Sequence, residues 1–269
     1  MHLRLQDLKT QLIMRDPAIE KPLNELEIDK VGIKNLKYPI KVFDKKEAEQ
    51  HTVATINMYV ALPHKFRGTH MSRFIEVLNK HKDTVAMKNM RFVLLDIIDK
   101  FDAYSAHIEL QFPYFIEKEA PVSHAHSLME YECKFICSLS QERKFEFILG
   151  VSVPIATLCP CSKALVDKGA HNQRGKISVL IKFQGFFWIE DIVNIVENCA
   201  STPLYSLLKR EDEQFITQYA YDHPAFVEDV ARNVASKLDK EKNISWYSVE
   251  VESYESIHNH DAYAFIEKK

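Results

Sequence analysis

The sequence predicts an α+β fold, in which antiparallel strands form sheets and helices cover one face of each sheet. Two observations support this prediction. Runs of alternating apolar and polar residues, typical of half-buried strands, are interrupted by segments with apolar residues at helical spacing. The order strand, two helices, two strands in the first half of the chain has a related order in the second half, although the sequence itself does not repeat. Strands with inserted helix pairs are typical of α+β proteins.

The regular elements of the first half begin after residue 50. Residues 1–50 contain three prolines and few long periodic segments, so we expect an arm that packs on another part of the protein. Beyond it, apolar residues alternate in some segments and recur at helical spacing in others. The expected elements are a strand at residues 52–62, helices at 71–82 and 90–101, and strands at 105–115 and 127–140.

The second half begins after a polar turn at residues 141–144, where we place the boundary between two modules. The first module is expected at residues 51–143 and the second at residues 144–269. The second module is expected to contain strands at residues 145–156 and 176–183, helices at 188–200 and 224–238, and a final strand at 246–256.

The overall charge and apolar content exclude several classes of protein. The chain has 35 basic and 38 acidic side chains, without the clustered basic excess of nucleic-acid-binding proteins, so we expect no nucleic-acid partner. No apolar run approaches the roughly 20 residues of a membrane span, and the first residues do not resemble a secretory signal. Five cysteines, an odd number, fit a reducing compartment, so we expect a cytoplasmic protein.

One loop carries unusual chemistry. The segment TLCPCSKALVDKGAHNQR at residues 157–174 contains Cys159, Cys161 and His171. A single residue separates the two cysteines, a spacing too short for the usual paired zinc ligands. Cys159 and His171 are a better pair of ligands for one metal ion, but the spacing alone also allows a free cysteine and a loop histidine. The cysteines in apolar segments, Cys133, Cys137 and Cys199, are expected to be buried.

Two further clusters could contribute to the same site. The segment LLKREDEQFIT at residues 207–217 concentrates charged side chains between apolar residues. The segment ESIHNH at residues 255–260 places acidic and imidazole groups directly after a predicted strand, a suitable position for meeting the loop. Solvated surface turns explain both clusters equally well when they are considered alone.

Together, several segments closely resemble the type IB GTP cyclohydrolases. They are HKFRGTHMSRFIE, TLCPCSKALVDKGAHNQRG, LLKREDEQFIT, HPAFVEDVARN and ESYESIHNHDAYAF, in this order, and the resemblance begins at DKVGIKNLKYPI and covers nearly the whole chain. It implies the tunnelling fold (T-fold), with two tandem ββααββ-type modules per chain, and a homotetramer with active sites between subunits. It also implies the hydrolysis of GTP to 7,8-dihydroneopterin triphosphate and formate, the entry to folate synthesis.

The resemblance also implies roles for individual residues. Cys159, His171 and Glu213 are expected to bind a divalent metal, with Glu255 and His258 as alternative ligands or proton-transfer groups. Glu228 is expected to hold guanine, because one carboxylate can accept hydrogen bonds from the ring N–H and the exocyclic amine together. The residues expected to bind the triphosphate are Arg67, His70, Arg73, Lys163, Arg174, Lys209 and Arg210.

A metal with an open position suits this reaction, because it lowers the pKa of a bound water that must attack the imidazole ring of GTP. Zinc, manganese and ferrous iron all accept such a mixed ligand set, and the sequence does not choose among them. Cys161 is expected to neighbour the metal thiolate or to be merely structural. His124 and His126 stand where the family has small or polar residues, and we expect exposed turn histidines there instead of an extra metal site.

Three other functions remain as alternatives. A nitrile reductase on the same fold would use Cys159 as a covalent nucleophile and would require NADPH. A related cyclohydrolase would form a cyclic phosphate product. A non-catalytic relative would only bind purines or a partner, but such a protein would be expected to have lost at least one of the site residues, and none is missing.

Overall fold

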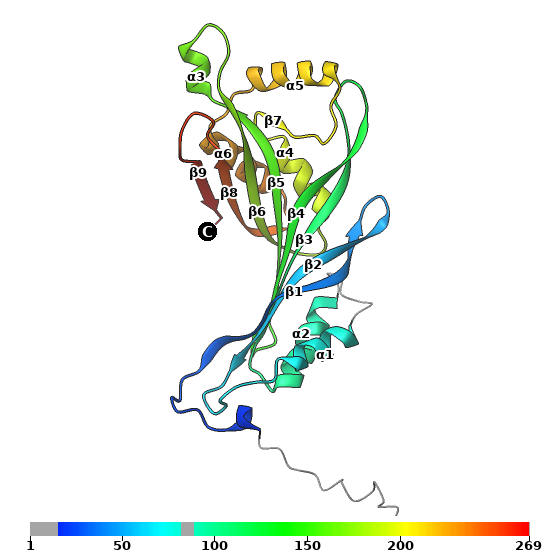
Figure 1. The fold of residues 1–269 in the computed structure, drawn as a ribbon, viewed down its shortest axis with the longest axis vertical. Helices are drawn as coiled ribbons and strands as arrows, with labels where there is room; N and C mark the ends of the chain where they lie inside the picture. Colours follow the sequence, from blue (N-terminus) through cyan, green and yellow to red (C-terminus); the bar gives the residue numbers. More distant parts are fainter. Residues whose placement is uncertain (1–15, 82–88, 269) are drawn as a thin grey trace, which may run out of the picture.

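The structure is a computed structural model, and it describes residues 16–81 and 89–268. Its centre is an antiparallel sheet with the strand order β1-β2-β3-β4-β5-β6-β8-β9, and the short strand β7 pairs with β5 (Figure 1). The strands are β1 (Ile28–Asp44), β2 (Ala48–Leu62), β3 (Ala106–Glu119), β4 (His126–Leu139), β5 (Phe145–Leu158), β6 (Asn172–Phe183), β7 (Thr202–Pro203), β8 (Ile244–Ser253) and β9 (Ala262–Glu267).

The helices are inserted between strands at corresponding places in the two halves. Two strands, two helices and two strands follow each other from β1 to β4, and the same order returns from β5 to β9 with α3, β7 and α5 added. The helices are the 3₁₀-helix η1 (Pro17–Ile19), α1 (Ser72–Lys80), α2 (Met90–Phe101), α3 (Pro160–Leu165), α4 (Ile189–Glu197), α5 (Arg210–Asp222) and α6 (Val227–Leu238).

One face of the sheet is apolar along its whole width. Residues that lie directly opposite each other on neighbouring strands point to the same face. Met58 lies opposite Ile108, which lies opposite Cys137, and all three are buried. In the second half, Val179 lies opposite Val249, and both are buried as well. These residues belong to one core cluster with the apolar sides of α1, α2, α4 and α6.

The other face is polar, so the strands alternate as half-buried antiparallel strands do. Among its side chains are Gln111, Lys134, Ser152, Ser178 and Glu250. Helices on one face and polar side chains on the other confirm the expected α+β class.

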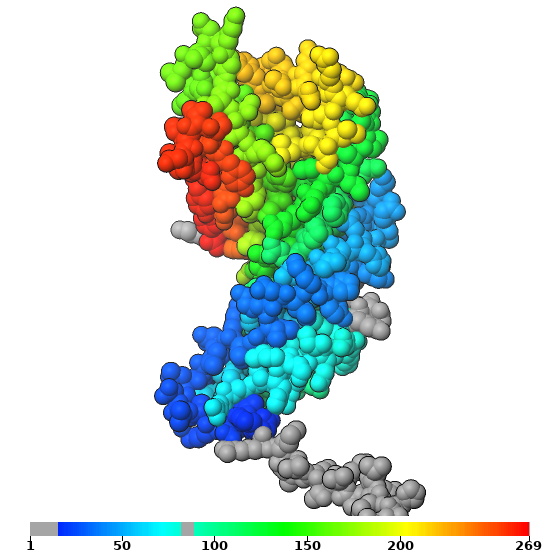
Figure 2. All heavy atoms as spheres, in the orientation of Figure 1, coloured from blue at the N-terminus to red at the C-terminus, as the bar shows by residue number. Residues whose placement is uncertain are grey.

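The molecule is elongated, and its two ends carry different elements. Figure 1 shows α1 and α2 near one end, while α3 and α5 lie at the other. The space-filling view shows the segment after β5 projecting from that second end, close to the last strands of the chain (Figure 2). Residues near α1 and residues near α3 of one chain are therefore far apart.

The first fifty residues differ from the expectation of an irregular arm. Strand β1 occupies residues 28–44 of this segment and pairs with β2 from Ile28 to Asp44. Pro39 lies within β1, which is possible because β1 is an edge strand and one of its sides has no partner strand in the sheet order. Residues 1–15 of the expected arm lie outside the described residues. The proposed module boundary remains a prediction, although a turn does separate β4 from β5.

Most other expected elements are confirmed with small shifts at their ends. The helix expected at residues 90–101 has these same bounds, while the one expected at 71–82 ends at Lys80, and Lys82 lies outside the described residues. The sequence interpretation missed α5, whose first turn it described as a charge cluster, and also missed α3, β7 and β9. In the described part of the chain, no helix is long and apolar enough to span a membrane.

Candidate functional site

The loop between β5 and β6 holds Cys159 and His171 side by side. The N–H of Cys159 donates a hydrogen bond to the carbonyl of His171, at 3.1 Å, which closes the base of the loop. Cys159 is the N-cap residue of α3, and its Sγ accepts from the N–H of Ser162 at 3.4 Å. The hydroxyl of Ser162 in turn accepts from the N–H of His171 at 3.2 Å. The thiol and the imidazole are therefore fixed to one small frame.

A buried glutamine orients the imidazole. Gln173 lies two residues after His171, on the first part of β6, and only 9% of it is exposed. Its Oε1 is 2.9 Å from Nδ1 of His171. Its Nε2 donates to the hydroxyl of Thr157 at 3.1 Å and to Oε1 of Glu255 at 3.4 Å. Because Glu255 can only accept when ionised, this arrangement turns the amide oxygen toward His171.

The end of β8 brings Glu255 to the same place. Ser253, the last residue of β8, bonds through its hydroxyl to Thr157 at 2.9 Å. Two residues later, Oε2 of Glu255 is 4.0 Å from Nδ1 of His171, and both side chains are largely buried. Strand β8 can lie this close to β6 because Gly175 has no side chain: a Cβ there would be 2.5 Å from the carbonyl oxygen of Glu252.

His258 lies farther along the same β8–β9 loop and is exposed. Its ring stacks on that of His260, with centroids 5.2 Å apart and 15° between the planes. The structure therefore places His258 in the loop that carries Glu255, at the solvent side.

The start of α6 is tied to the end of β5. The N–H of Ala225 donates to the carbonyl of Leu158 at 3.2 Å, and the N–H of Leu158 donates to the hydroxyl of Ser201 at 3.0 Å. Glu228 lies in the first turn of α6, three residues after Ala225, and is exposed. One backbone residue, Leu158, thus joins the Cys159 loop to the helix that carries the expected guanine ligand.

Helix α5 lies across this end of the molecule, and Tyr221, near its C-terminal end, contacts the loop. Lys163 of α3 donates to the carbonyl of Tyr221 and lies over the ring of the same residue, 4.3 Å from its centroid. Glu213 is in the first turn of α5, eight residues before Tyr221, which corresponds to about 12 Å along a helix. Glu213 is exposed, and among the described residues it forms no metal-ligand group with Cys159 and His171.

Asp212 fixes the beginning of α5. Its carboxylate accepts from the N–H groups of Val122, Ser123 and Lys209 and from the hydroxyl of Ser123, at 2.6 to 2.9 Å. Burial would raise the pKa of this carboxyl group, but the hydrogen bonds, led by those of Ser123, outweigh it and hold the pKa well below its usual range. The turn between β3 and β4 therefore positions Lys209, Arg210 and Glu213.

The expected phosphate ligands are distributed over the whole molecule. Arg67 pairs with Glu20 at 3.4 Å, and His70 pairs with Asp16 at 2.8 Å. Both residues, like Arg73, precede or begin α1 at the end opposite to α3. Arg174 is exposed on β6, beside the loop. Within one chain, the structure does not bring Arg67, His70 and Arg73 together with Cys159.

The remaining residues singled out in the sequence have ordinary surroundings. Cys161 is exposed on α3, whereas Cys133, Cys137 and Cys199 are buried, as expected. His124 and His126 are exposed and pair with Glu119 and Glu117 respectively. They occupy the β3–β4 turn and the start of β4, in agreement with the interpretation as exposed turn histidines.

The donor chemistry near Cys159 fits a divalent metal ion, but the complete ligand set is not assembled in one chain. Within residues 16–81 and 89–268, no three His, Cys, Asp or Glu side chains are arranged to hold a metal. The loop nevertheless gathers a thiol, an imidazole and a carboxylate, which together suit zinc, manganese or ferrous iron. The bond from Nδ1 of His171 to Gln173 leaves Nε2 as the nitrogen for a ligand.

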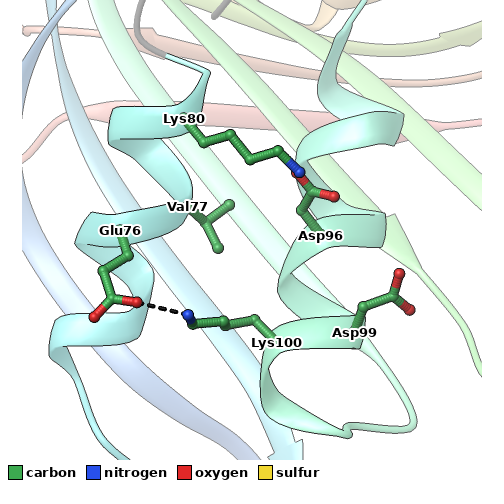
Figure 3. Close-up of a pocket in the computed structure, with 6 residues that line it drawn as sticks. All are labelled: Glu76, Val77, Lys80, Asp96, Asp99 and Lys100. Atoms are coloured by element: carbon green, nitrogen blue, oxygen red, sulfur yellow. Dashed lines mark ion pairs between the residues drawn. The ribbon is translucent and has the colours of Figure 1, made fainter.

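A hollow elsewhere on the surface contains none of the expected site residues. It lies between α1 and α2, has a volume of about 380 Å³, and is lined by Glu76, Val77, Lys80, Asp96, Asp99 and Lys100 (Figure 3). Lys100 pairs with Glu76 at 2.7 Å and Lys80 with Asp96 at 2.6 Å, while Asp99 pairs with Arg143 outside the hollow at 3.8 Å, so each charged side chain of the hollow has a partner.

The sequence interpretation missed Gln173, Thr157 and Ser253. A signal for Gln173 was present, since residues two apart on a strand point to the same face, and His171 and Gln173 have this spacing at the start of β6. No comparable signal identified Thr157 or Ser253. Their contact depends on the pairing of β6 with both β5 and β8.

Comparison with known proteins gives the same family over nearly the whole chain. Residues 14–264 match the family described as "Type I GTP cyclohydrolase folE2". The chain is 54% identical to "GTP cyclohydrolase FolE2" of Geotalea uraniireducens over 255 residues, which cover 95% of this chain and 93% of the relative. It is 51% identical to the protein of the same name from Syntrophotalea carbinolica, over 94% of this chain and 95% of the relative.

Solved structures with low sequence identity support the fold alone. Uricase from Arthrobacter globiformis matches with a TM-score of 0.52 and 10% identity, covering 89% of this chain and 92% of the other. A urate oxidase from Bacillus sp. TB-90 matches with a TM-score of 0.53 and 8% identity, covering 90% and 98%. These are tunnelling-fold proteins, so the expected fold is confirmed.

Proposed function

The chain belongs to the type I GTP cyclohydrolase FolE2 family, and on this basis we propose that the Cys159 loop is the place where it opens the imidazole ring of GTP. The enzyme is a type IB GTP cyclohydrolase I, which hydrolyses GTP to 7,8-dihydroneopterin triphosphate and formate at the start of folate synthesis. The observation that carries the location is the shared anchor at Leu158. It joins the loop with the thiol and the imidazole to the helix with Glu228.

The metal-binding residues in our proposal are Cys159 and His171 of one chain and Glu213 of another, with Glu255 and His258 as alternative ligands or proton-transfer groups. When bound, a divalent metal lowers the pKa of a coordinated water, so that hydroxide is available near neutral pH. Which ion is used, zinc, manganese or ferrous iron, depends on geometry and supply. The donor set at the loop supports a metal of this class.

The protein's own side chains hold the substrate and move protons. Glu228 accepts hydrogen bonds from the ring N–H and the exocyclic amine of guanine, and adenine would leave this carboxylate unpaired. We infer that His258, which is exposed on the β8–β9 loop, gives a proton to the ring nitrogen that leaves and takes one back in later steps.

We propose a homotetramer in which each active site is formed by more than one chain. Two features of the single chain support it. Glu213 lies eight residues before Tyr221, the residue of α5 that contacts the loop, which is about 12 Å along a helix. Arg67, His70 and Arg73 lie at the opposite end of the molecule. A second chain can supply both sets. Lys163, Arg174, Lys209 and Arg210 would complete the cationic pocket for the triphosphate. Light scattering of the purified protein should give four times the mass of the 31.3 kDa chain.

The competing functions are not favoured. Relatives that are 54% and 51% identical to this chain are named GTP cyclohydrolase FolE2, and this name favours the cyclohydrolase reaction. We also propose a cytoplasmic location, which the five free cysteines support, since thiols stay reduced there.

The reaction itself is tested with protein that has been stripped of metal and reloaded separately with zinc, manganese or ferrous iron. Incubation with GTP is followed by measuring formate and the fluorescence of the oxidised pterin. We expect metal-dependent formation of both products, in equal amounts. A folded tetramer that releases no formate with any of the three metals would overturn the proposal, and NADPH would then be the next reagent to test.

A further inference from the structure

We propose that Gln173 is a positioning residue that sets the tautomer of His171, so that Nε2 is free to bind the metal. This proposal deepens the proposed function and rests on the role of His171 as a ligand. Gln173 itself would not touch the metal or the substrate. It would act only through the imidazole with which it shares a hydrogen bond.

The side-chain amide of Gln173 can take only one of its two orientations. Nε2 of Gln173 faces Oε1 of Glu255, at 3.4 Å, and an ionised carboxylate has no hydrogen to donate. If the amide were reversed, its oxygen would face this carboxylate and would lose the hydrogen bond. The hydroxyl of Thr157, 3.1 Å from the same nitrogen, can accept and still donate to Ser253. The two partners of the amide nitrogen therefore fix the amide oxygen on the side of His171.

The tautomer of His171 follows from this direction. The amide oxygen is only an acceptor, so Nδ1 of His171, 2.9 Å away, has to carry the hydrogen. A neutral imidazole with hydrogen on Nδ1 has its lone pair on Nε2. Among the described residues, no side chain or backbone group forms a hydrogen bond with Nε2, so this lone pair remains available. Partners of this kind on the second ring nitrogen commonly fix metal-binding histidines.

The residues whose hydrogen bonds orient His171 are buried. Gln173 is 9% exposed, Thr157 is 2% exposed and Ser253 is 1% exposed, so water does not compete freely for these bonds. Each of the three comes from a different strand, β6, β5 and β8, and the pairing of these strands sets their positions. The imidazole is thus oriented by the paired ends of three strands and not by the exposed part of its own loop.

The first test compares the affinity of the metal-free protein for Mn²⁺, measured from the electron paramagnetic resonance signal of the free ion. Gln173→Leu removes the acceptor, and we expect it to weaken Mn²⁺ binding about 10- to 100-fold. Ser178→Ala is the control. It removes a side-chain hydrogen bond between Ser178 on β6 and Ser152 on β5, the strands that carry Gln173 and Thr157, but away from the loop.

A second measurement needs no variant of Gln173. The ¹⁵N shifts of the imidazole of His171 in the metal-free wild-type protein at about pH 8.5, where an ordinary imidazole is neutral, report which nitrogen carries the hydrogen. The signal is assigned by its loss in His171→Asn. We expect hydrogen on Nδ1, and hydrogen on Nε2 would overturn the proposal even if Gln173→Leu does not fold.

The outcomes separate this inference from the proposed metal site. If His171→Asn binds Mn²⁺ as well as the wild type, the proposed metal site itself is wrong. If His171→Asn loses Mn²⁺ while Gln173→Leu binds it like Ser178→Ala, the metal site stands and the role of Gln173 is wrong.

Discussion

The N–H of Ala225 donates a hydrogen bond to the carbonyl of Leu158, at 3.2 Å, and this bond holds the start of α6 against the last residue of β5. Cys159 follows Leu158 directly, and Glu228 lies in the first turn of α6. The same backbone contact therefore fixes the positions of Glu228, which would bind guanine, and of Cys159, which would bind the metal.

Replacement of Glu228 should weaken the binding of GTP. In Glu228→Ala the guanine edge loses two hydrogen bonds to a charged acceptor, so kcat/KM should fall about 100-fold, equivalent to about 3 kcal/mol, mainly through KM. Steady-state formate release at varied GTP concentration measures it. Asp229→Asn, in the same helical turn, is the control and should keep the KM of the wild type. An unchanged KM in Glu228→Ala would rule out the role in guanine binding.

The two cysteines of the loop should behave differently. Cys159 shares a hydrogen-bonded frame with His171, while Cys161 is exposed on α3. Cys159→Ala should therefore abolish formate release and lower the metal content of the purified protein. Cys161→Ala should retain both. Full activity in Cys159→Ala would contradict the assignment, and metal analysis of the two variants by mass spectrometry provides the comparison.

Removal of the Asp212 carboxylate should loosen the start of α5. Asp212→Ala leaves the N–H groups of Val122, Ser123 and Lys209 without their acceptor. We expect a lower melting temperature and faster hydrogen exchange in the β3–β4 turn and the first turn of α5. Glu211→Ala is the matched control, since Glu211 is an exposed acidic residue of the same turn. Equal exchange in the two variants would show that the carboxylate does not hold this junction.

The pH dependence of stability should report on Asp44. Burial would raise the pKa of its carboxyl group, but bonds from the N–H groups of Glu47 and Lys46 and from Tyr114 outweigh it and lower the pKa below its ordinary value of 3.8. Since the unfolded chain then takes up the proton first, the stabilisation is complete above about pH 4 and is lost as the pH falls through the lowered pKa.

Urea unfolding of Asp44→Ala and wild type at several pH values tests this expectation. At pH 7 the variant should be less stable by about 1 to 3 kcal/mol, because the N–H groups of Lys46 and Glu47 and the buried hydroxyl of Tyr114 lose an acceptor. The difference should shrink toward pH 3. Glu49→Ala, which removes a half-exposed ion pair with Lys41, should have a small effect at any pH. If the difference in unfolding free energy between Asp44→Ala and the wild type stays constant with pH, the lowered pKa of Asp44 is contradicted.

The fold was predictable where the apolar pattern was strong. Helix α2 has its expected bounds because its apolar residues recur at helical spacing and pack on the sheet. Strand β1 was missed because most of its residues are polar or half-exposed and because Pro39 is tolerated only at an edge, which the sequence does not reveal. Helix α5 was missed because its acidic first turn, favourable at a helix N-terminus, resembles a solvated turn.

The sequence identified the residues of the candidate site that belong to recognisable motifs, but not the contacts between them. The motifs identified Cys159, His171 and Glu255, which the structure places around one loop. The distance of Glu213 from this loop depends on the direction of α5, and the contact of Gln173 with Glu255 depends on the pairing of three strands. Neither is a local property of the sequence, so only the folded chain could provide them.

The measurement that tests the central claim most directly is activity in mixed tetramers of two inactive variants. Cys159→Ala and Glu213→Ala are co-expressed with different tags, the mixed species is purified, and formate release from GTP is measured. If each site combines Cys159 of one chain with Glu213 of another, some sites in the mixture are intact and activity should return. The pair Cys159→Ala with His171→Ala, both on one loop, should remain inactive. No activity in the first mixture, despite mixed tetramers, would contradict a site shared between subunits.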